Sequence, residues 1–103
     1  GPVAPVIAFS TDEEAIALAN GTEYGLSAAV QSGSLEHAAA VADRLNAGMV
    51  HINDQTVNEE ANAPFGGFGQ SSNGGHFGGV TQLELWTEWQ WRTSRDQAEP
   101  FPF

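Results

Sequence analysis

The 103-residue chain contains no cysteine and no lysine, and thirteen acidic residues outnumber three arginines, giving a formal net charge of -10. Without cysteine, the chain can form no disulfide, thiolate metal site or thiol nucleophile. So few basic residues argue against nucleic acid and anionic membranes as partners, because both draw affinity from Lys and Arg. Long hydrophobic runs are also missing, since none approaches the roughly 20 residues that span a bilayer. We therefore expect a cytoplasmic protein whose partners include neither nucleic acid nor membrane.

The first half of the chain alternates between short apolar runs and helical patterns. Residues 3–9 are rich in Val and Ile and predict a strand, which two prolines confine to an early or edge position. A helix is predicted next, because Ser10 and Thr11 each precede a Glu by three residues, the spacing of a capping box. Asn20 and Gly21 would end that helix, since both tolerate the left-handed conformation of a C-cap.

The same alternation continues to residue 53. Residues 26–31 and 49–53 predict strands. Between them, apolar residues recur at spacings of three and four from position 35 to 45, which predicts a helix that Ser34 can cap. This order of elements, with short connections, is typical of a parallel sheet. The fold class is therefore α/β, a partial parallel sheet in the order β-α-β-α-β.

The second half of the chain follows a different pattern. Residues 54–79 are polar and Gly-rich with no sustained period, which is typical of a functional loop or a linker. A turn of helix is expected over residues 83–86. In residues 87–93, Trp89 and Trp91 alternate with polar residues, which predicts a half-buried strand. Neither the partial sheet nor this strand has a partner nearby, so we expect the chain to complete itself against something else.

No spacing of polar residues predicts a reaction centre. The three histidines lack the spacing of metal ligands, and His51 is interpreted as a packed or hydrogen-bonded residue of its strand. Glu59 and Glu60 are neighbours on a loop, where two solvated carboxylates are the simpler interpretation. The Gly-Phe-Gly at 67–69 lacks the third glycine of a dinucleotide-binding turn. We therefore assign no catalytic, cofactor-binding or metal-binding residue from spacing.

Several short motifs nevertheless occur in register along the chain: Gly-Pro-Val at 1–3, Tyr-Gly-Leu-Ser-Ala at 24–28, Ala-Gly at 47–48, His-Ile-Asn at 51–53 and Pro-Phe-Gly-Gly at 64–67. Together they resemble the C-terminal quarter of the NAD(P)-dependent aldehyde dehydrogenase superfamily. The closing segment, with Thr-Glu-Trp-Gln-Trp at 87–91 and a Phe-Pro-Phe end, is similar to the benzaldehyde, salicylaldehyde and vanillin dehydrogenase branch.

This resemblance implies a subunit with a cofactor-binding domain, a catalytic domain and a small oligomerisation sheet. In such enzymes a Cys thiolate attacks the aldehyde, a hydride passes to the nicotinamide of NAD or NADP, and a Glu activates the water that releases the acid. This chain has no Cys, and the family's Glu lies upstream of the matched region. We therefore expect the isolated chain to be inactive, with the cofactor bound mainly by the rest of the dehydrogenase polypeptide.

The resemblance also implies roles for single residues. The family's substrate tunnel is lined by the loop after the Asn-containing strand, which here contains Thr56, Val57 and Asn58, with Phe65 nearby as an aromatic wall. An aromatic aldehyde needs a mostly apolar slot, which Val57 and Phe65 suit, and Asn58 can hydrogen-bond a ring substituent. Asn53 resembles the structural Asn of this loop.

Other positions are assigned structural roles by the same resemblance. Gly66 and Gly67 belong to the loop turn of the Pro-Phe-Gly-Gly motif. Ser72 replaces a glycine that is usual in the family, and a positive φ there would strain the backbone by about 1–3 kcal/mol. The last predicted strand would join the oligomerisation sheet of a homo-oligomer, where a partner subunit would bury Trp89 and Trp91.

Three regions follow from this interpretation. Residues 1–53 would be the C-terminal part of the catalytic α/β domain, residues 54–86 the substrate-tunnel and Gly-rich loop region, and residues 87–103 the oligomerisation strand and tail. The leading hypothesis is the C-terminal portion of a dehydrogenase that oxidises an aromatic aldehyde to the acid. The alternative is a stand-alone, non-catalytic assembly or binding module derived from the same fold.

Overall fold

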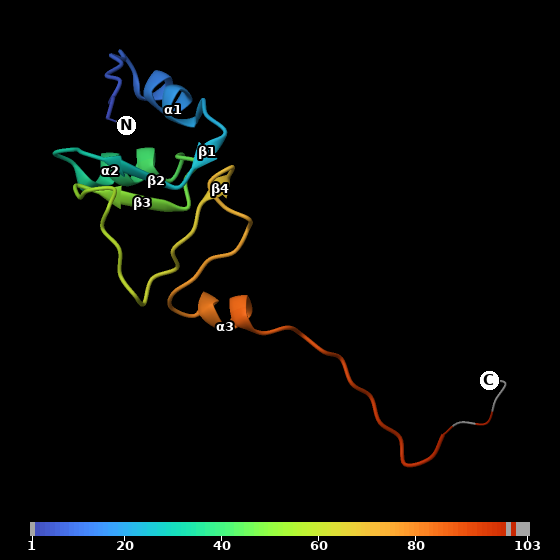
Figure 1. Ribbon diagram of the computed structural model, residues 1–103. Coiled ribbons are helices and arrows are strands. Elements are labelled where there is room, and N and C mark those ends of the chain that lie inside the picture. Colours follow the sequence, from blue (N-terminus) through green and yellow to red (C-terminus); the bar gives the residue numbers. More distant parts are fainter. Residues whose placement is uncertain (1, 99, 101–103) are drawn as a thin grey trace.

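A computed structural model describes residues 2–98 and residue 100 of the chain (Figure 1). The described part combines three short helices with two separate two-stranded sheets. In chain order the elements are α1 (Asp12–Asn20), β1 (Tyr24–Gly25), β2 (Ser27–Val30), α2 (Leu35–Ala42), β3 (Met49–Ile52), β4 (Phe68–Gly69) and α3 (Thr81–Trp86). Among these residues, no helix is long and apolar enough to cross a membrane.

The centre of the fold is a parallel pair of strands. β2 pairs with β3 in a register that sets Ser27 opposite Met49 and Val30 opposite Ile52. α2 connects the two strands and packs against one face of the pair (Figure 1). Ala38 of α2 is fully buried there, because its small side chain allows the helix to approach the sheet closely. The predicted strand-helix-strand unit of this region is therefore confirmed.

Both main helices begin where the sequence predicts. The Thr11 hydroxyl accepts a hydrogen bond from the backbone N–H of Glu14 at 3.3 Å, and the Ser34 hydroxyl accepts one from His37 at 3.2 Å. The predicted left-handed end of α1 is wrong, since Gly21 has a φ of -75°. Its N–H instead donates to the Leu18 carbonyl at 3.3 Å, a tightened last turn that needs no positive φ.

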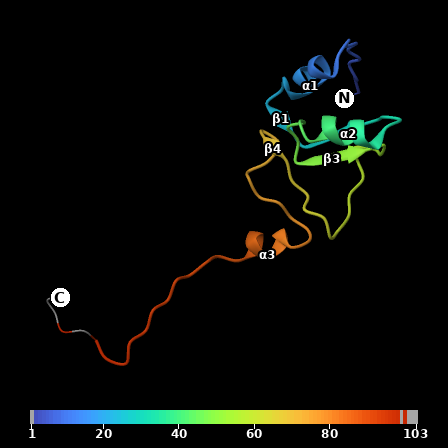
Figure 2. The ribbon, with the colours of Figure 1, turned by 180° about the vertical axis from the view of Figure 1, so that it is seen from behind.

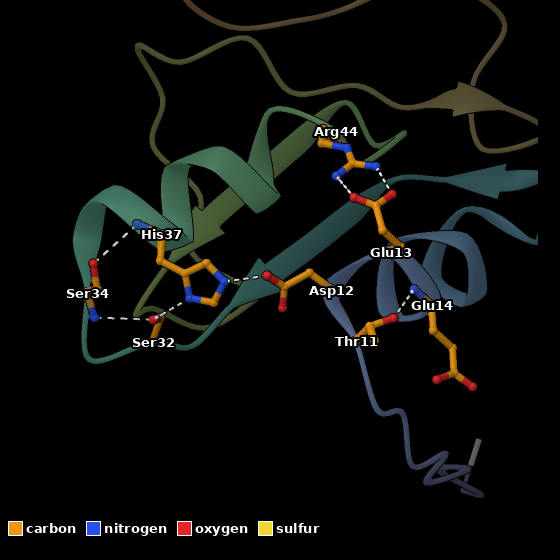
Figure 3. A network of polar contacts seen from close by, with 8 residues as sticks. All are labelled: Thr11, Asp12, Glu13, Glu14, Ser32, Ser34, His37 and Arg44. Carbon is orange, nitrogen blue, oxygen red and sulfur yellow. Dashed lines mark hydrogen bonds and ion pairs between the residues drawn. The ribbon is translucent and has the colours of Figure 1, made fainter.

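One histidine–carboxylate hydrogen bond and one ion pair join α1 to the α2 region (Figure 3). The Asp12 carboxylate accepts a hydrogen bond from His37 Nε2 at 2.7 Å. The Glu13 carboxylate faces the guanidinium of Arg44 with two contacts, one of them 2.6 Å long. This guanidinium lowers the pKa of Glu13, by hydrogen bonding first and by its charge second. Because these groups are exposed, the pairs orient α1 more than they stabilise the fold.

The predicted strand at residues 3–9 is wrong for this chain. The segment has no backbone pairing among the described residues, and its apolar side chains are exposed, including Val6 at 97%. The physical reason is that a strand needs a partner. Pro2 and Pro5 have no N–H to donate, and no strand of the described chain lies alongside to accept hydrogen bonds from the other backbone N–H groups. The β-α-β-α-β order is therefore reduced to its last β-α-β unit.

The Gly-rich region contains structure that the sequence pattern did not predict. β4 pairs antiparallel with β1, setting Gly25 opposite Phe68, and a bridge joins Phe65 to Phe77. These ladders are two residues and one residue long, too short to produce a period in the sequence. The predicted strain at Ser72 does not occur, because Gly74, with a φ of 93°, takes the positive angle instead.

Residues 87–98, after α3, run away from the rest of the described chain in an extended path, as both views show (Figures 1 and 2). Trp89 and Trp91 are 98% and 92% exposed. The half-buried strand predicted for residues 87–93 is therefore absent from the single chain, since no second strand accepts its backbone hydrogen bonds within the described part. The Gly at position 1 and the Phe-Pro-Phe end used in the resemblance lie outside the described residues.

The resulting chain has little core of its own. Ile16 and Ala38 are its buried hydrophobic residues in the described ranges. The Cα radius of gyration is 21.4 Å, whereas a compact domain of about 100 residues has one of roughly 13 Å. The described residues therefore leave many of their large apolar side chains exposed, including Val6, Trp89 and Trp91.

Candidate functional site

The loop that follows β3 starts at a strained residue. Asn53 has a φ of 55°, the one positive value among the described non-glycine residues. Its side chain compensates with two hydrogen bonds, since Oδ1 accepts from the Ser32 N–H at 2.8 Å and Nδ2 donates to the Ser32 carbonyl at 3.0 Å. Asn is among the few residues that tolerate this region. The loop therefore leaves the strand in a fixed direction.

The carboxylate of Asp54 organises the next turn. It accepts hydrogen bonds from the Gln55 N–H at 2.8 Å and from Asn58 Nδ2 at 2.5 Å. These bonds, the Gln55 one foremost, hold the pKa of Asp54 below its ordinary value, and nearby His51 adds to the effect. An ionised carboxylate only accepts hydrogen bonds, so Asn58 must present its NH₂ to Asp54. The amide oxygen of Asn58 is thereby left for another donor.

A cavity of about 610 Å³ lies beside this loop. Its wall contains Asn58 and Phe65 of the predicted tunnel residues, together with both ends of the Phe65–Phe77 bridge. The two Phe rings lie 4.8 Å apart at 43°, a tilted aromatic contact that forms an apolar side. Thr56 and Val57 do not line this cavity, and Val57 is 73% exposed. The structure thus brings two of the four residues together.

The cavity also has lining residues that sequence reasoning missed. Met49, Phe77 and Gln82 come from β3, the bridge and α3, three segments far apart in the sequence. His51 lines it too, and its buried Nε2 has no hydrogen-bond partner among the described residues. The predicted hydrogen-bonded His51 therefore lacks a bond at this atom. The strand period does place residues 49 and 51 on one face, but no local signal connects them to α3.

The remaining predicted residues lie around the cavity or far from it. Gly66 and Gly67 are buried, and a Cβ on Gly67 would lie 2.8 Å from the Ser71 Cβ. A side chain at Gly48 would collide with the Gly66 carbonyl, so two glycines allow these backbones to touch. Trp89 and Trp91 take no part in the cavity wall.

The candidate acid–base and metal residues form no reaction centre. Glu59 and Glu60 border the cavity but are exposed, as two solvated carboxylates would be. Across residues 2–98 and 100, no three His, Asp or Glu side chains are grouped to hold a metal ion. The cavity has an apolar side with polar groups at its edge, and it contains no thiol nucleophile, because the chain has no cysteine.

The sequence pattern of the aldehyde dehydrogenase family matches residues 1–92. The chain is 48% identical over 103 residues to a benzaldehyde dehydrogenase [NAD(+)] of Pseudomonas putida, covering 100% of this chain and 21% of that protein. It is 47% identical over 104 residues to a vanillin dehydrogenase of Amycolatopsis sp., again with 100% and 21% covered.

Solved structures give the same result for the fold. The crystal structure of a salicylaldehyde dehydrogenase from Pseudomonas putida G7, complexed with salicylaldehyde, matches with a TM-score of 0.86 and 37% identity. The match covers 100% of this chain and 21% of that one. The chain thus spans about a fifth of the length of the curated relatives it matches. With nine-tenths of its residues inside the family pattern, the chain belongs to the aldehyde dehydrogenase family.

Proposed function

We propose that this chain acts as the C-terminal portion of an NAD(P)-dependent aldehyde dehydrogenase of the cytoplasm that oxidises an aromatic aldehyde to the acid. The observation that carries the proposal is the 48% identity over 103 residues to a benzaldehyde dehydrogenase, a match that covers 100% of this chain. The loop and cavity described above support a role in the substrate tunnel. The nucleophile and the general base come from the rest of the dehydrogenase polypeptide.

Within that enzyme, this segment forms one wall of the aldehyde site. Phe65 supplies an apolar surface against which an aromatic ring packs. Asn58 offers its free amide oxygen to a hydroxyl on the ring, since its NH₂ is engaged by Asp54. Thr56 and Val57 are exposed on the same loop outside this cavity, where they are free to contact the substrate in the assembled tunnel.

The cofactor is held by other parts of the enzyme. The name of the Pseudomonas putida relative specifies NAD(+). In this chain, the glycines at 67–69 are followed by a turn and not by a helix, so no helix N-terminus is available there to hold a pyrophosphate. The described residues therefore do not fit a dinucleotide site, and no step of the reaction through the cofactor is assigned to them.

A chimera tests the proposal directly. In it, this chain replaces the matching fifth of the Pseudomonas putida benzaldehyde dehydrogenase, and the product is assayed for benzaldehyde-dependent reduction of NAD+. We expect activity within about tenfold of the relative's, because the wall of the site is supplied by related residues. A chimera that unfolds as cooperatively as the relative but shows no turnover would contradict the proposed function.

A further inference from the structure

The exposed loop after β3 is held by side chains of the β2 region, which neither the family resemblance nor the comparisons assign. Ser27 Oγ donates a hydrogen bond to the Thr56 carbonyl at 2.9 Å. Gln31 Nε2 donates to the Asp54 carbonyl, also at 2.9 Å. With the Asn53–Ser32 bonds at its start, this loop is fixed at three successive points.

Backbone hydrogen bonds between β2 and β3 cannot hold the loop in place. β3 ends at Ile52, and the last ladder-like bond joins the Asn53 N–H to the Val30 carbonyl at 2.9 Å. Beyond Asn53 the positive φ turns the chain out of the sheet, so the next carbonyls cannot continue the ladder. Side chains at both ends of β2 take over as donors to these carbonyls.

Ser27 has the most direct influence on the tunnel wall. It lies on a strand that is paired along its length with β3, and its side chain is half-buried. A short hydroxyl on a fixed backbone has few rotamers, so it restrains the Thr56 carbonyl more tightly than the long, exposed Gln31 restrains Asp54. Thr56 and its neighbour Val57 are two of the proposed wall residues.

We propose that Ser27 is a positioning residue for aldehyde binding, acting through the Thr56 carbonyl to hold the loop at residues 54–58 against the substrate. This inference rests on the proposed function, since it assigns the loop to the aldehyde site. It predicts a defect in substrate binding, because the loop contacts the aldehyde equally before and during the reaction.

The test uses the benzaldehyde dehydrogenase chimera with Ser27→Ala. We expect KM for benzaldehyde to rise about 2- to 10-fold with kcat nearly unchanged, the range for one lost neutral hydrogen bond. Ser27→Thr keeps the hydroxyl on a residue that suits a strand and should restore KM. Ser71→Ala is the matched control: Ser71 is also half-buried and its hydroxyl accepts from the Gly25 N–H at 3.1 Å, away from the loop.

Hydrogen–deuterium exchange of the same variants gives a readout that does not require turnover. In Ser27→Ala, amides of residues 54–58 should exchange several-fold faster, while Ser71→Ala should leave them unchanged. Unchanged KM and exchange in Ser27→Ala, or equal changes in Ser71→Ala, overturn the inference. An inactive chimera that still shows selective loop exchange would contradict the proposed function and retain the positioning role.

Discussion

At the scale of single residues, two carboxylates hold neighbouring segments in place through hydrogen bonds and an ion pair. Glu13 and Arg44 meet across the space between α1 and the end of α2 (Figure 3). The Asp54 carboxylate accepts hydrogen bonds from Gln55 and Asn58 within one turn of the loop. Each carboxylate has a pKa below its ordinary value because donors surround its charged form. These contacts can be tested by titration.

The Glu13–Arg44 contact predicts the pH dependence of one carboxyl. In the folded chain, Glu13 should titrate below its ordinary pKa of 4.5, and Arg44→Gln should return the midpoint toward that value. NMR detection of the Glu13 carboxyl carbon measures both midpoints. Since folding lowers this pKa, the stability that the pair contributes is present above pH 4.5 and is lost as pH falls through the folded midpoint.

High salt and a control residue test whether Arg44 causes the lowered pKa of Glu13. About 1 M NaCl should move the Glu13 midpoint back toward 4.5, because exposed pairs are screened. Asp54, whose carboxylate accepts from Gln55 and Asn58 and makes no contact with Arg44, should keep its lowered pKa in Arg44→Gln. An unshifted Glu13 midpoint in the unmodified chain would show that α1 does not dock as described.

At the scale of elements, residues 87–98 follow an extended path away from α3 with no strand assigned to them (Figure 2). The side chains of Trp89 and Trp91 are almost fully exposed. Such an edge is ordinarily paired or protected. We propose that in the assembled enzyme residues 87–93 form a strand that pairs with a second subunit and buries both tryptophans.

This proposal predicts a change of oligomeric state. In the chimera, Trp89→Ala with Trp91→Ala should weaken subunit association by about 2 kcal/mol or more per buried tryptophan, the usual size for interface aromatics. Light scattering coupled to size exclusion, run over a dilution series, measures the dissociation. Gln90→Ala is the matched control, since Gln90 alternates with the two tryptophans and would face the opposite side. Identical dissociation of both variants would contradict the assignment.

At the scale of the whole molecule, the described residues bury little of their own apolar surface. They contain two small sheets, little buried core and a cavity whose wall includes no cysteine. Relatives that match the chain are about five times as long. These observations support the proposal that the chain serves as a segment of a larger enzyme.

The isolated chain should consequently lack dehydrogenase activity. Without a cysteine it cannot form the thiohemiacetal from which the hydride leaves, so no benzaldehyde-dependent NADH should appear above the rate of a heat-treated sample. Absorbance at the NADH wavelength, with the Pseudomonas putida enzyme as positive control, measures this. Turnover by the pure chain would refute the proposal that the nucleophile and the general base come from the rest of the polypeptide.

The intact mass of the protein from its source cells tests the alternative function. A value near 10.9 kDa would favour the stand-alone assembly module.

The sequence by itself determined the local structure wherever short-range chemistry decides it. Thr11 and Ser34 begin helices because their hydroxyls accept the first free N–H groups. The β2-α2-β3 unit follows from two short runs with the character of strands on either side of apolar residues spaced by three and four. The family motifs could also be identified from the sequence, because their residues occur in register along the chain.

Only the tertiary structure decided what depends on distant partners. Residues 3–9 and 87–93 have the pattern of strands, yet a strand exists only when another one accepts its hydrogen bonds. The cavity joins β3, the Phe65–Phe77 bridge and α3, so no local pattern could predict His51 or Gln82 in its wall. The Ser27–Thr56 bond likewise joins residues 29 positions apart, so no local pattern could predict it.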